Sequence, residues 1–237
     1  MGTSRARRAL LVLGVSGALL SAAEAQSKWV RHYHERVASF REENAKLALG
    51  ARYVVLVGDS LMEGWRYRKR VAKYLPRVGA KVLNRGITAD GLSAKRGLLA
   101  RLDASIFDCQ PERVFILIGV NDLGRDGSGL RRVEERYAAL VGKVRERRPE
   151  CPLVLVTCSP VGRAYRPMNP HIVKLNDHIR ALAKARGCAL LDLHSLLADA
   201  SGALPESMSR DGLHFGDQGY ALFGRAIEAL CVVRKGR

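Results

Sequence analysis

The stretch Tyr53-Val54-Val55-Leu56-Val57-Gly58-Asp59-Ser60 decides the fold of this chain. Five apolar residues in an unbroken run predict a short strand that is buried on both faces of a parallel sheet. The run ends in a glycine and two polar residues. In an open parallel sheet, functional residues lie in the loops that leave the carboxyl ends of the strands. Asp59 and Ser60 are therefore candidates for a functional site.

Four further apolar runs have the same character, and longer segments with helical periodicity separate them. These runs lie at residues 81–83, 114–118, 153–157 and 189–193. Helices are expected at 66–74, 92–102, 129–148, 170–186 and 217–232. The alternation predicts an α/β fold, a three-layer α/β/α sandwich with a five-stranded parallel sheet. The 237 residues, 47% of them hydrophobic, suffice for one sizeable core but not for two comfortable domains.

The first 25 residues have the composition of a secretory signal peptide. Three arginines precede an uncharged apolar run from Ala9 to Leu20, and small residues follow that end in Ala23-Glu24-Ala25. This run is 12 residues long, whereas a membrane-spanning helix needs roughly 20. We therefore expect cleavage after residue 25 and export to the periplasm or the medium, with an uncleaved anchor as the alternative.

Residues 26–50 precede the main domain, which is expected to span residues 51–237. Apolar residues recur there at helical spacing, which predicts an amphipathic helix over 28–49 that packs on the domain. These residues are Trp29, Tyr33, Val37, Phe40 and Leu47. No internal repeat or low-complexity linker indicates a further domain.

The chain is strongly basic, with a formal net charge of +17 that becomes +15 without residues 1–25. Outside the cytoplasm, such charge favours association with an anionic cell envelope, through acidic wall polymers, lipid headgroups or acidic polysaccharides. The alternative is codon bias, because arginine outnumbers lysine by 30 to 10. The arginines are spread along the chain and are not clustered with aromatic residues, so nucleic-acid binding is not expected.

Five cysteines leave at least one unpaired thiol in a monomer, and none has zinc-ligand or C-x-x-C spacing, so no metal site is expected. Cys109, Cys151 and Cys188 each precede a predicted strand and should lie at the sheet edge opposite the functional loops. A bridge between Cys109 and Cys151 is geometrically plausible in an oxidising compartment. Alternatively, all five cysteines are small buried hydrophobic residues.

Polar blocks follow the first three predicted strands, and a fourth block precedes the last helix. These blocks are Gly58-Asp59-Ser60-Leu61, Asn84-Arg85-Gly86-Ile87, Gly119-Val120-Asn121-Asp122 and Asp211-Gly212-Leu213-His214. In this order and spacing, the set resembles the SGNH hydrolase superfamily, also called GDSL esterases and lipases. The resemblance covers the chain from about Tyr53 to the final helix. It implies a flavodoxin-like fold and a serine esterase.

The residue types fit that chemistry. A serine hydroxyl becomes a good nucleophile only when a neighbouring imidazole removes its proton, and these roles fall to Ser60 and His214. Asp211, three residues before the histidine, can orient and stabilise the imidazolium. The resemblance further implies an oxyanion hole formed by the backbone N–H groups of Ser60 and Gly86 and the side-chain amide of Asn121. No phosphate-binding glycine loop, Rossmann fingerprint or metal motif appears, so no cofactor is expected.

Each of these residues also has a structural interpretation. Ser60 could cap the following helix, although the other three blocks favour the catalytic role. Gly86 could only permit a tight turn, and Asn121 could only bond its own loop. Asp59 and Asp122 are expected to hold loop amides and to transfer no proton. Among the six histidines, only His214 offers D-x-x-H in a late loop.

The short loops leave little sequence for a deep lipid tunnel or a lid. We therefore expect a shallow site for a short acyl group, with deacetylation of a small-molecule or polysaccharide ester as the leading hypothesis. Lysophospholipase or thioesterase activity would use the same residues and differ only in the acyl pocket. A non-catalytic envelope-binding protein on the same fold is the alternative from another class.

Basic residues follow the nucleophile closely, at Arg66, Arg68, Lys69 and Arg70. They could attract an acidic substrate, or they could form only a solvated helix face. Trp65 and Tyr67 could stack on a sugar ring, or they could be packing residues.

Overall fold

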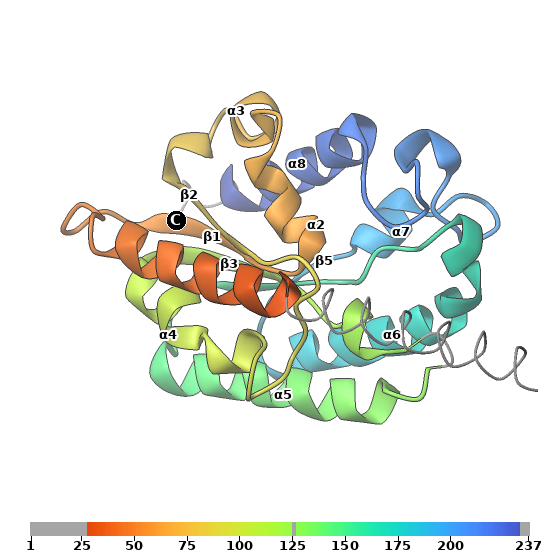
Figure 1. The fold of residues 1–237 in the computed structure, drawn as a ribbon, viewed down its shortest axis with the longest axis horizontal. Coiled ribbons are helices and arrows are strands. Elements are labelled where there is room, and N and C mark those ends of the chain that lie inside the picture. The colour runs from red at the N-terminus through yellow and green to blue at the C-terminus, as the bar shows by residue number, and fades with distance from the viewer. Residues whose placement is uncertain (1–27, 125–126, 233–237) are drawn as a thin grey trace, which may run out of the picture.

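A computed structural model describes residues 28–124 and 127–232 of the chain. Five parallel strands form one sheet in the order β2-β1-β3-β4-β5, as predicted (Figure 1). Their bounds are β1 Tyr53–Gly58, β2 Val82–Gly86, β3 Pro111–Leu117, β4 Leu153–Val156 and β5 Ala189–Leu191. The first strand, β1, lies inside the sheet, with β2 paired on one side of it and β3 paired on the other. The loops after β1, β2 and β3 therefore meet at a topological switch point, where open α/β sheets bind ligands.

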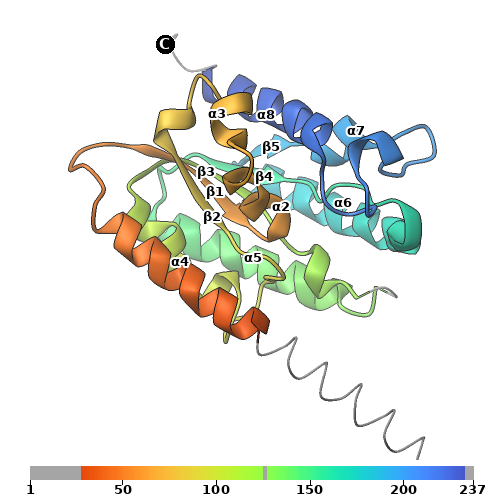
Figure 2. The same ribbon diagram turned by 45° about the horizontal axis from the view of Figure 1, so that its top comes forward.

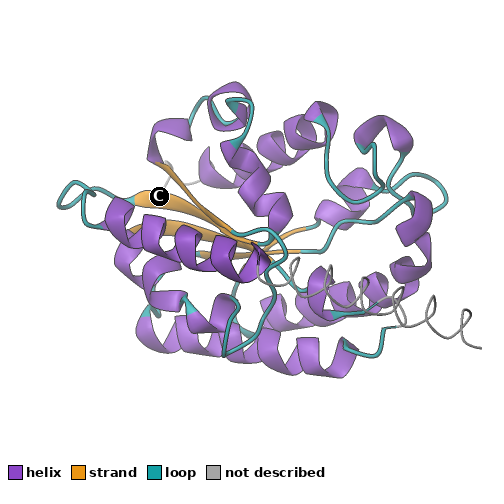
Figure 3. Cartoon of the chain, viewed as in Figure 1, coloured by secondary structure: helices purple, strands orange, loops and turns teal. Residues whose placement is uncertain are grey.

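Both faces of the sheet are covered by helices, which completes the three-layer sandwich (Figures 2 and 3). One face carries α4 (Leu102–Ser105), α5 (Leu130–Arg147) and α6 (Asn169–Ala185), and the other carries α2 (Ser60–Glu63), α3 (Arg70–Tyr74), α7 (Leu193–Leu197) and α8 (Asp217–Val232). Successive residues of β1 point to opposite faces, so Val55 packs in the first core and Leu56 in the second.

The predicted helices at 129–148, 170–186 and 217–232 are present as α5, α6 and α8, with ends within about a residue. The helix predicted at 92–102 was wrong. Leu92 and Leu98 are both buried, but the chain between them forms a closed loop in which the Leu98 N–H donates to the Gly91 carbonyl at 2.7 Å. Leu92 and Leu98 therefore have helical spacing because they are the two buried ends of a loop. The only helical segment between residue 92 and α4 is a 3-10 turn at Leu98–Ala100.

The helix predicted at 66–74 begins later than expected. A 3-10 turn occupies Gly64–Arg66, and α3 starts only at Arg70. Between them, Arg68 and Lys69 both have φ of 52°, the left-handed conformation that interrupts a right-handed helix.

An amphipathic helix covers residues 28–44, whereas the expected range extended to residue 49. Tyr33, Val37 and Phe40 are buried in a small cluster with Ile87 and Ala104. Polar contacts also fix this helix to the domain. Among them, His32 Nε2 lies 3.0 Å from Glu63 Oε2, and Arg85 donates to Glu43 at 2.6 Å. The signal peptide expected at 1–25 lies outside the described residues. Within the described part of the chain, no helix has both the length and the apolar character of a membrane span.

All five cysteines are free thiols, so the bridge between Cys109 and Cys151 was wrong. The Cys109 thiol lies 3.5 Å from Asn44 Oδ1 and 3.6 Å from the Ala104 carbonyl oxygen, in the core between the sheet and the N-terminal helix. Cys109, Cys151 and Cys188 do precede β3, β4 and β5, at the amino ends of the strands. These three cysteines therefore lie at the edge of the sheet opposite the loops that carry the polar blocks.

Candidate active site

Ser60 is the first residue of α2 and follows β1 directly. Asp59 caps this helix, because its Oδ1 accepts the Leu61 N–H at 3.0 Å. The helix is held on the sheet by its buried residues Leu61 and Met62. The Ser60 side chain is thereby presented, half-buried, at the carboxyl edge of the sheet. The structural role expected for Asp59 is confirmed.

Asp211 and His214 lie in the loop before α8, and the aspartate organises that loop. Its Oδ1 accepts the N–H groups of Leu213 at 2.9 Å and of His214 at 2.8 Å, and the Ser209 hydroxyl at 3.1 Å. Its other oxygen, Oδ2, lies 2.7 Å from His214 Nδ1. Burial would raise the pKa of Asp211, but these hydrogen bonds outweigh it and hold the pKa well below the usual value. The carboxylate is therefore ionised at neutral pH.

The imidazole connects this loop to the serine. His214 Nε2 lies 3.0 Å from Ser60 Oγ, across 154 positions of sequence. Because an ionised carboxylate only accepts hydrogen bonds, the Nδ1 atom facing Asp211 carries the proton. Nε2 is then the acceptor for the serine hydroxyl. The geometry is that of a nucleophile, a base and an orienting acid in one hydrogen-bonded chain.

Asn121 lies in a 3-10 turn at Val120–Asp122, directly after β3. Its side chain is exposed, and its amide donates to the Asp90 carbonyl at 2.8 Å. An amide group has two donor hydrogens, so one remains for a ligand. The neighbouring Asp122 accepts the Leu92 N–H at 2.9 Å, which confirms its structural role. Asn121 therefore stands at the same edge of the sheet as Ser60, with a second amide hydrogen that forms no hydrogen bond within the described residues.

Gly86 does not fit the oxyanion role. It is buried at the end of β2, and its N–H already donates to Asn84 Oδ1 at 3.0 Å. A Cβ at this position would lie 2.0 Å from the backbone nitrogen of Glu63. Glycine is thus required because α2 packs closely against β2. The hydrogen bond to Asn84 leaves no N–H for a substrate.

The next turn supplies a donor that the sequence did not indicate. Ala89 is exposed and has φ of 61°, a left-handed conformation that is uncommon for a residue with a Cβ. Among the hydrogen bonds of the described residues, none uses the Ala89 N–H. The residue after it, Asp90, accepts from Asn121, so this turn and Asn121 are in contact.

A buried arginine ties these loops together. Arg101 donates to Asp90 Oδ2 from Nε at 2.9 Å and from Nη2 at 2.7 Å. It also donates to the carbonyls of Gly58 at 3.0 Å and Arg85 at 2.9 Å. One guanidinium thereby holds the ends of β1 and β2 and the Ala89 turn in a fixed relation. Nothing in the sequence distinguished this arginine from the others.

A cavity of about 690 Å³ opens beside the histidine, and we call it the His214 cavity. Charged and polar side chains form most of its lining, with Met208 and Phe215 as apolar members. Asp211 and His214 themselves form part of the wall. No group of three histidine, cysteine, aspartate or glutamate side chains within the described ranges is arranged to hold a metal ion.

A family model for the GDSL-like lipase/acylhydrolase family matches residues 56–222. The chain belongs to that family. This GDSL-like protein is a hydrolase that acts on ester bonds. The match covers every polar block from which the resemblance to SGNH hydrolases was stated, and that resemblance is confirmed. No curated protein matches this GDSL-like chain.

Solved structures share the fold of this GDSL-like hydrolase at low identity. A Streptococcus pneumonia protein, provisionally named a platelet activating factor, is 21% identical, with 90% of this chain and 98% of that chain covered and a TM-score of 0.77. A GDSL-like lipase from Bacteroides thetaiotaomicron is 21% identical, with coverages of 82% and 96% and a TM-score of 0.68. The acetylxylan esterase Axe2 from Geobacillus stearothermophilus is 19% identical, with coverages of 79% and 98% and a TM-score of 0.63.

Proposed function

We propose that this hydrolase is an exported serine esterase that removes short acyl groups, above all O-acetyl groups, from a carbohydrate. One observation carries the catalytic part of the proposal: Ser60 Oγ, His214 and Asp211 form a continuous chain with contacts of 3.0 and 2.7 Å. A serine that only capped α2 would have no need of an oriented imidazole at its hydroxyl.

The reaction proceeds through an acyl-enzyme. Ser60 Oγ attacks the ester carbonyl carbon while His214 Nε2 takes the hydroxyl proton, and the carbonyl electron pair moves onto its oxygen. The tetrahedral intermediate then collapses, the bond to the alcohol oxygen breaks, and His214 gives its proton to that oxygen. Water adds to the acyl group by the same steps, releases the carboxylic acid and restores Ser60.

Charge on the intermediate needs hydrogen-bond donors. We assign this role to the backbone N–H of Ser60 and the side-chain amide of Asn121. The third donor is the backbone N–H of Ala89, in place of the Gly86 N–H that the sequence had indicated. Ser60 is suited because the first residue of a helix has no preceding turn to accept its N–H. Each such donor is typically worth about 3 kcal/mol of barrier.

The lining of the His214 cavity supports a polar alcohol portion of the ester, because polar side chains predominate there and an apolar group would gain little. Axe2, which shares the fold, is an acetylxylan esterase, so carbohydrate acetates are the substrates to test first. The test is a chain-length profile on p-nitrophenyl esters together with acetate release from acetylated oligosaccharides. A maximum at acetate is expected, whereas a maximum at octanoate or beyond would favour a lysophospholipase or thioesterase.

Export is proposed from the signal-peptide pattern of residues 1–25, and envelope association from the net charge of +15 that remains without them. Fractionation of cells that express the full chain should place the activity outside the cytoplasm. Association with an anionic envelope should weaken as salt is raised, because the Debye length falls to about 3 Å at 1 M. Retention in the cytoplasmic fraction would contradict the export proposal.

A further inference from the structure

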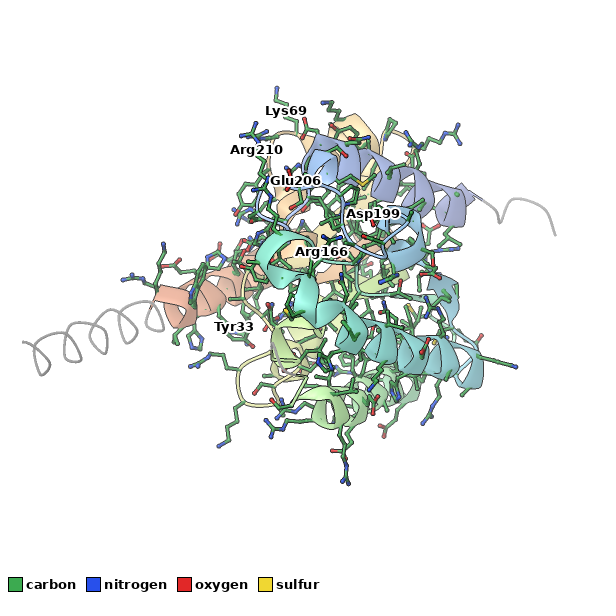
Figure 4. The ribbon with its side chains drawn as sticks, turned by 90° about the vertical axis from the view of Figure 1, so that its right-hand side faces the viewer. Tyr33, Lys69, Arg166, Asp199, Glu206 and Arg210 are labelled. Atoms are coloured by element: carbon green, nitrogen blue, oxygen red, sulfur yellow. The ribbon has the colours of Figure 1, made fainter. Side chains whose placement is uncertain are left out.

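Two segments far apart in the sequence form the walls of the His214 cavity. One is the turn at residues 67–70, which follows α2, and the other is the loop of residues 206–218, which carries Asp211 and His214. Figure 4 shows Lys69 of the turn and Arg210 of the loop at the same end of the molecule, with both side chains pointing away from the ribbon. The turn contributes no member of the hydrogen-bonded chain of Ser60, His214 and Asp211, whereas the loop supplies two of its three residues.

The turn at residues 67–70 has an unusual backbone at its basic residues. Arg68 and Lys69 are consecutive residues with φ of 52°, a conformation that residues with a Cβ rarely adopt. The turn is anchored on both sides: the Tyr67 N–H donates to the Gly64 carbonyl at 3.2 Å, and Arg70 Nη1 donates to the same carbonyl at 2.9 Å. Strained backbone that the surrounding structure maintains is characteristic of functional sites.

The carboxylates that line the cavity are already paired. Glu206 lies 3.1 Å from the Arg163 guanidinium, and Asp217 lies 3.4 Å from Lys73 Nζ and 3.8 Å from Arg70 Nε. Asp211 is paired with the imidazole. Its lining therefore offers no uncommitted carboxylate to neutralise further cations.

Two lining arginines form no direct ion pair, and Arg68 has only a longer-range electrostatic interaction with Asp217. Arg68 and Arg210 are exposed, and neither forms an ion pair with any residue in the described ranges. Because each guanidinium presents a planar fork of N–H donors, the pair suits a carboxylate or phosphate. Beside them, Tyr67 is 49% exposed and contributes an aromatic side chain to the lining.

The reaction geometry decides which part of the ester enters this cavity. His214 Nε2 gives its proton to the leaving alcohol oxygen, so the alcohol lies on the side of the imidazole. The carbonyl oxygen lies on the other side, toward Asn121 and Ala89. Since His214 forms part of the cavity wall, the alcohol portion of the substrate extends into the cavity.

We propose that the His214 cavity binds an anionic group on the alcohol portion of the ester, held by Arg68 and Arg210, and that the substrate is an acylated sugar acid. This inference rests on the proposed esterase function. Tyr67 favours a sugar, because an aromatic side chain can pack against the apolar face of a pyranose ring while the arginines take the carboxylate. A sugar phosphate presents the same anionic chemistry, and the experiment below distinguishes the two.

The test compares esters that differ only in charge. The first is a methyl glucoside with one O-acetyl group, and the second is the methyl glucuronoside acetylated at the same hydroxyl. The third is the acetylated methyl glucoside 6-phosphate. Acetate release gives kcat/KM for each, and p-nitrophenyl acetate reports the esterase itself. The variants are Arg68→Gln, Arg210→Gln and the matched control Arg41→Gln, an exposed arginine of the N-terminal helix that does not line the cavity.

We expect the wild type to prefer the glucuronoside over the glucoside by about tenfold in kcat/KM, as two partly exposed charge contacts would give. Each cavity variant should lower this ratio by about threefold, whereas Arg41→Gln should keep it. The ratio should also fall as salt is raised. A larger ratio for the phosphate ester would overturn the sugar acid in favour of a sugar phosphate.

A ratio near one in a wild type that hydrolyses p-nitrophenyl acetate would overturn the anionic subsite and leave the esterase function intact. A ratio that Arg68→Gln and Arg210→Gln do not change would overturn it as well. Absence of turnover on all esters, p-nitrophenyl acetate included, would instead contradict the esterase function on which the subsite depends.

Discussion

Arg101 Nη2 lies 2.7 Å from Asp90 Oδ2, and both side chains are fully shielded from solvent. A buried ion pair that loses one partner leaves the other charge without compensation, which destabilises a protein by about 3–5 kcal/mol. Here the loss would be compounded, because Arg101 also holds the carbonyls at the ends of β1 and β2.

We therefore predict that Arg101→Met lowers the free energy of unfolding by at least about 3 kcal/mol, measured by urea denaturation at pH 7. The control is Arg131→Met, which removes an exposed pair with Glu135 and should change stability by less than about 0.5 kcal/mol. Equal effects of the two substitutions would show that the buried pair does not organise the loops.

Burial raises the pKa of Asp59 to about 7, although its bond with the Leu61 N–H acts in the opposite direction. Between pH 4 and 7 the folded protein therefore binds a proton that the unfolded chain has lost, and this contribution makes stability fall as pH rises. Asp59→Asn removes the titration and keeps an oxygen to cap α2. We predict that the loss of stability between pH 5 and pH 8 is smaller in the variant by about 2–3 kcal/mol.

Urea denaturation of both proteins at the two pH values checks this prediction. Parallel pH dependences in wild type and Asp59→Asn would mean that the Asp59 pKa is unperturbed in the folded state.

Asn121 should matter to catalysis far more than to folding. Its side chain is exposed, and its hydrogen bond within the described structure is to the Asp90 carbonyl. Asn121→Ala is predicted to lower kcat/KM on p-nitrophenyl acetate by about 100-fold, the effect of losing one oxyanion donor, with less than about 1 kcal/mol change in stability. Retention of activity within threefold would assign Asn121 to the support of its loop alone.

Ala89 offers a test of the donor that replaces Gly86. Ala89 has a left-handed conformation. Glycine adopts this conformation freely, whereas a residue with a β-branched side chain strongly disfavours it. Ala89→Gly should therefore keep activity within about threefold, and Ala89→Val should lower kcat/KM by about tenfold or more by turning the N–H away. If both variants behave like wild type in the p-nitrophenyl acetate assay, the Ala89 N–H does not face the substrate.

The sheet and the serine, histidine and aspartate could be predicted because each depends on a local signal. Unbroken apolar runs indicated the five buried strands, and polar blocks after those runs indicated the edge on which Ser60 and Asn121 lie. The contact between Ser60 and His214 spans 154 positions, so it followed from the topology of parallel strands and from the family resemblance.

What could not be predicted depends on tertiary contacts. A glycine near a site either presents its N–H or permits close packing. At Gly86 the close approach of the α2 backbone shows that packing requires the glycine. Ala89 and Arg68 give no local sign of their left-handed conformation, since neither residue type favours it. Leu92 and Leu98 have spacing compatible with a helix, but a closed loop buries both of them.

The hydrolysis of p-nitrophenyl acetate by the purified protein, with Ser60→Ala, His214→Ala and the control Ser39→Ala measured alongside, decides whether Ser60 is the nucleophile. Ser39 is a suitable control because its hydroxyl contacts Glu43 on the N-terminal helix, away from the His214 cavity. We predict that the wild type and Ser39→Ala turn over equally, while Ser60→Ala and His214→Ala each lose at least about 1,000-fold in kcat. Turnover by Ser60→Ala at the rate of the wild type would contradict the acyl-enzyme mechanism.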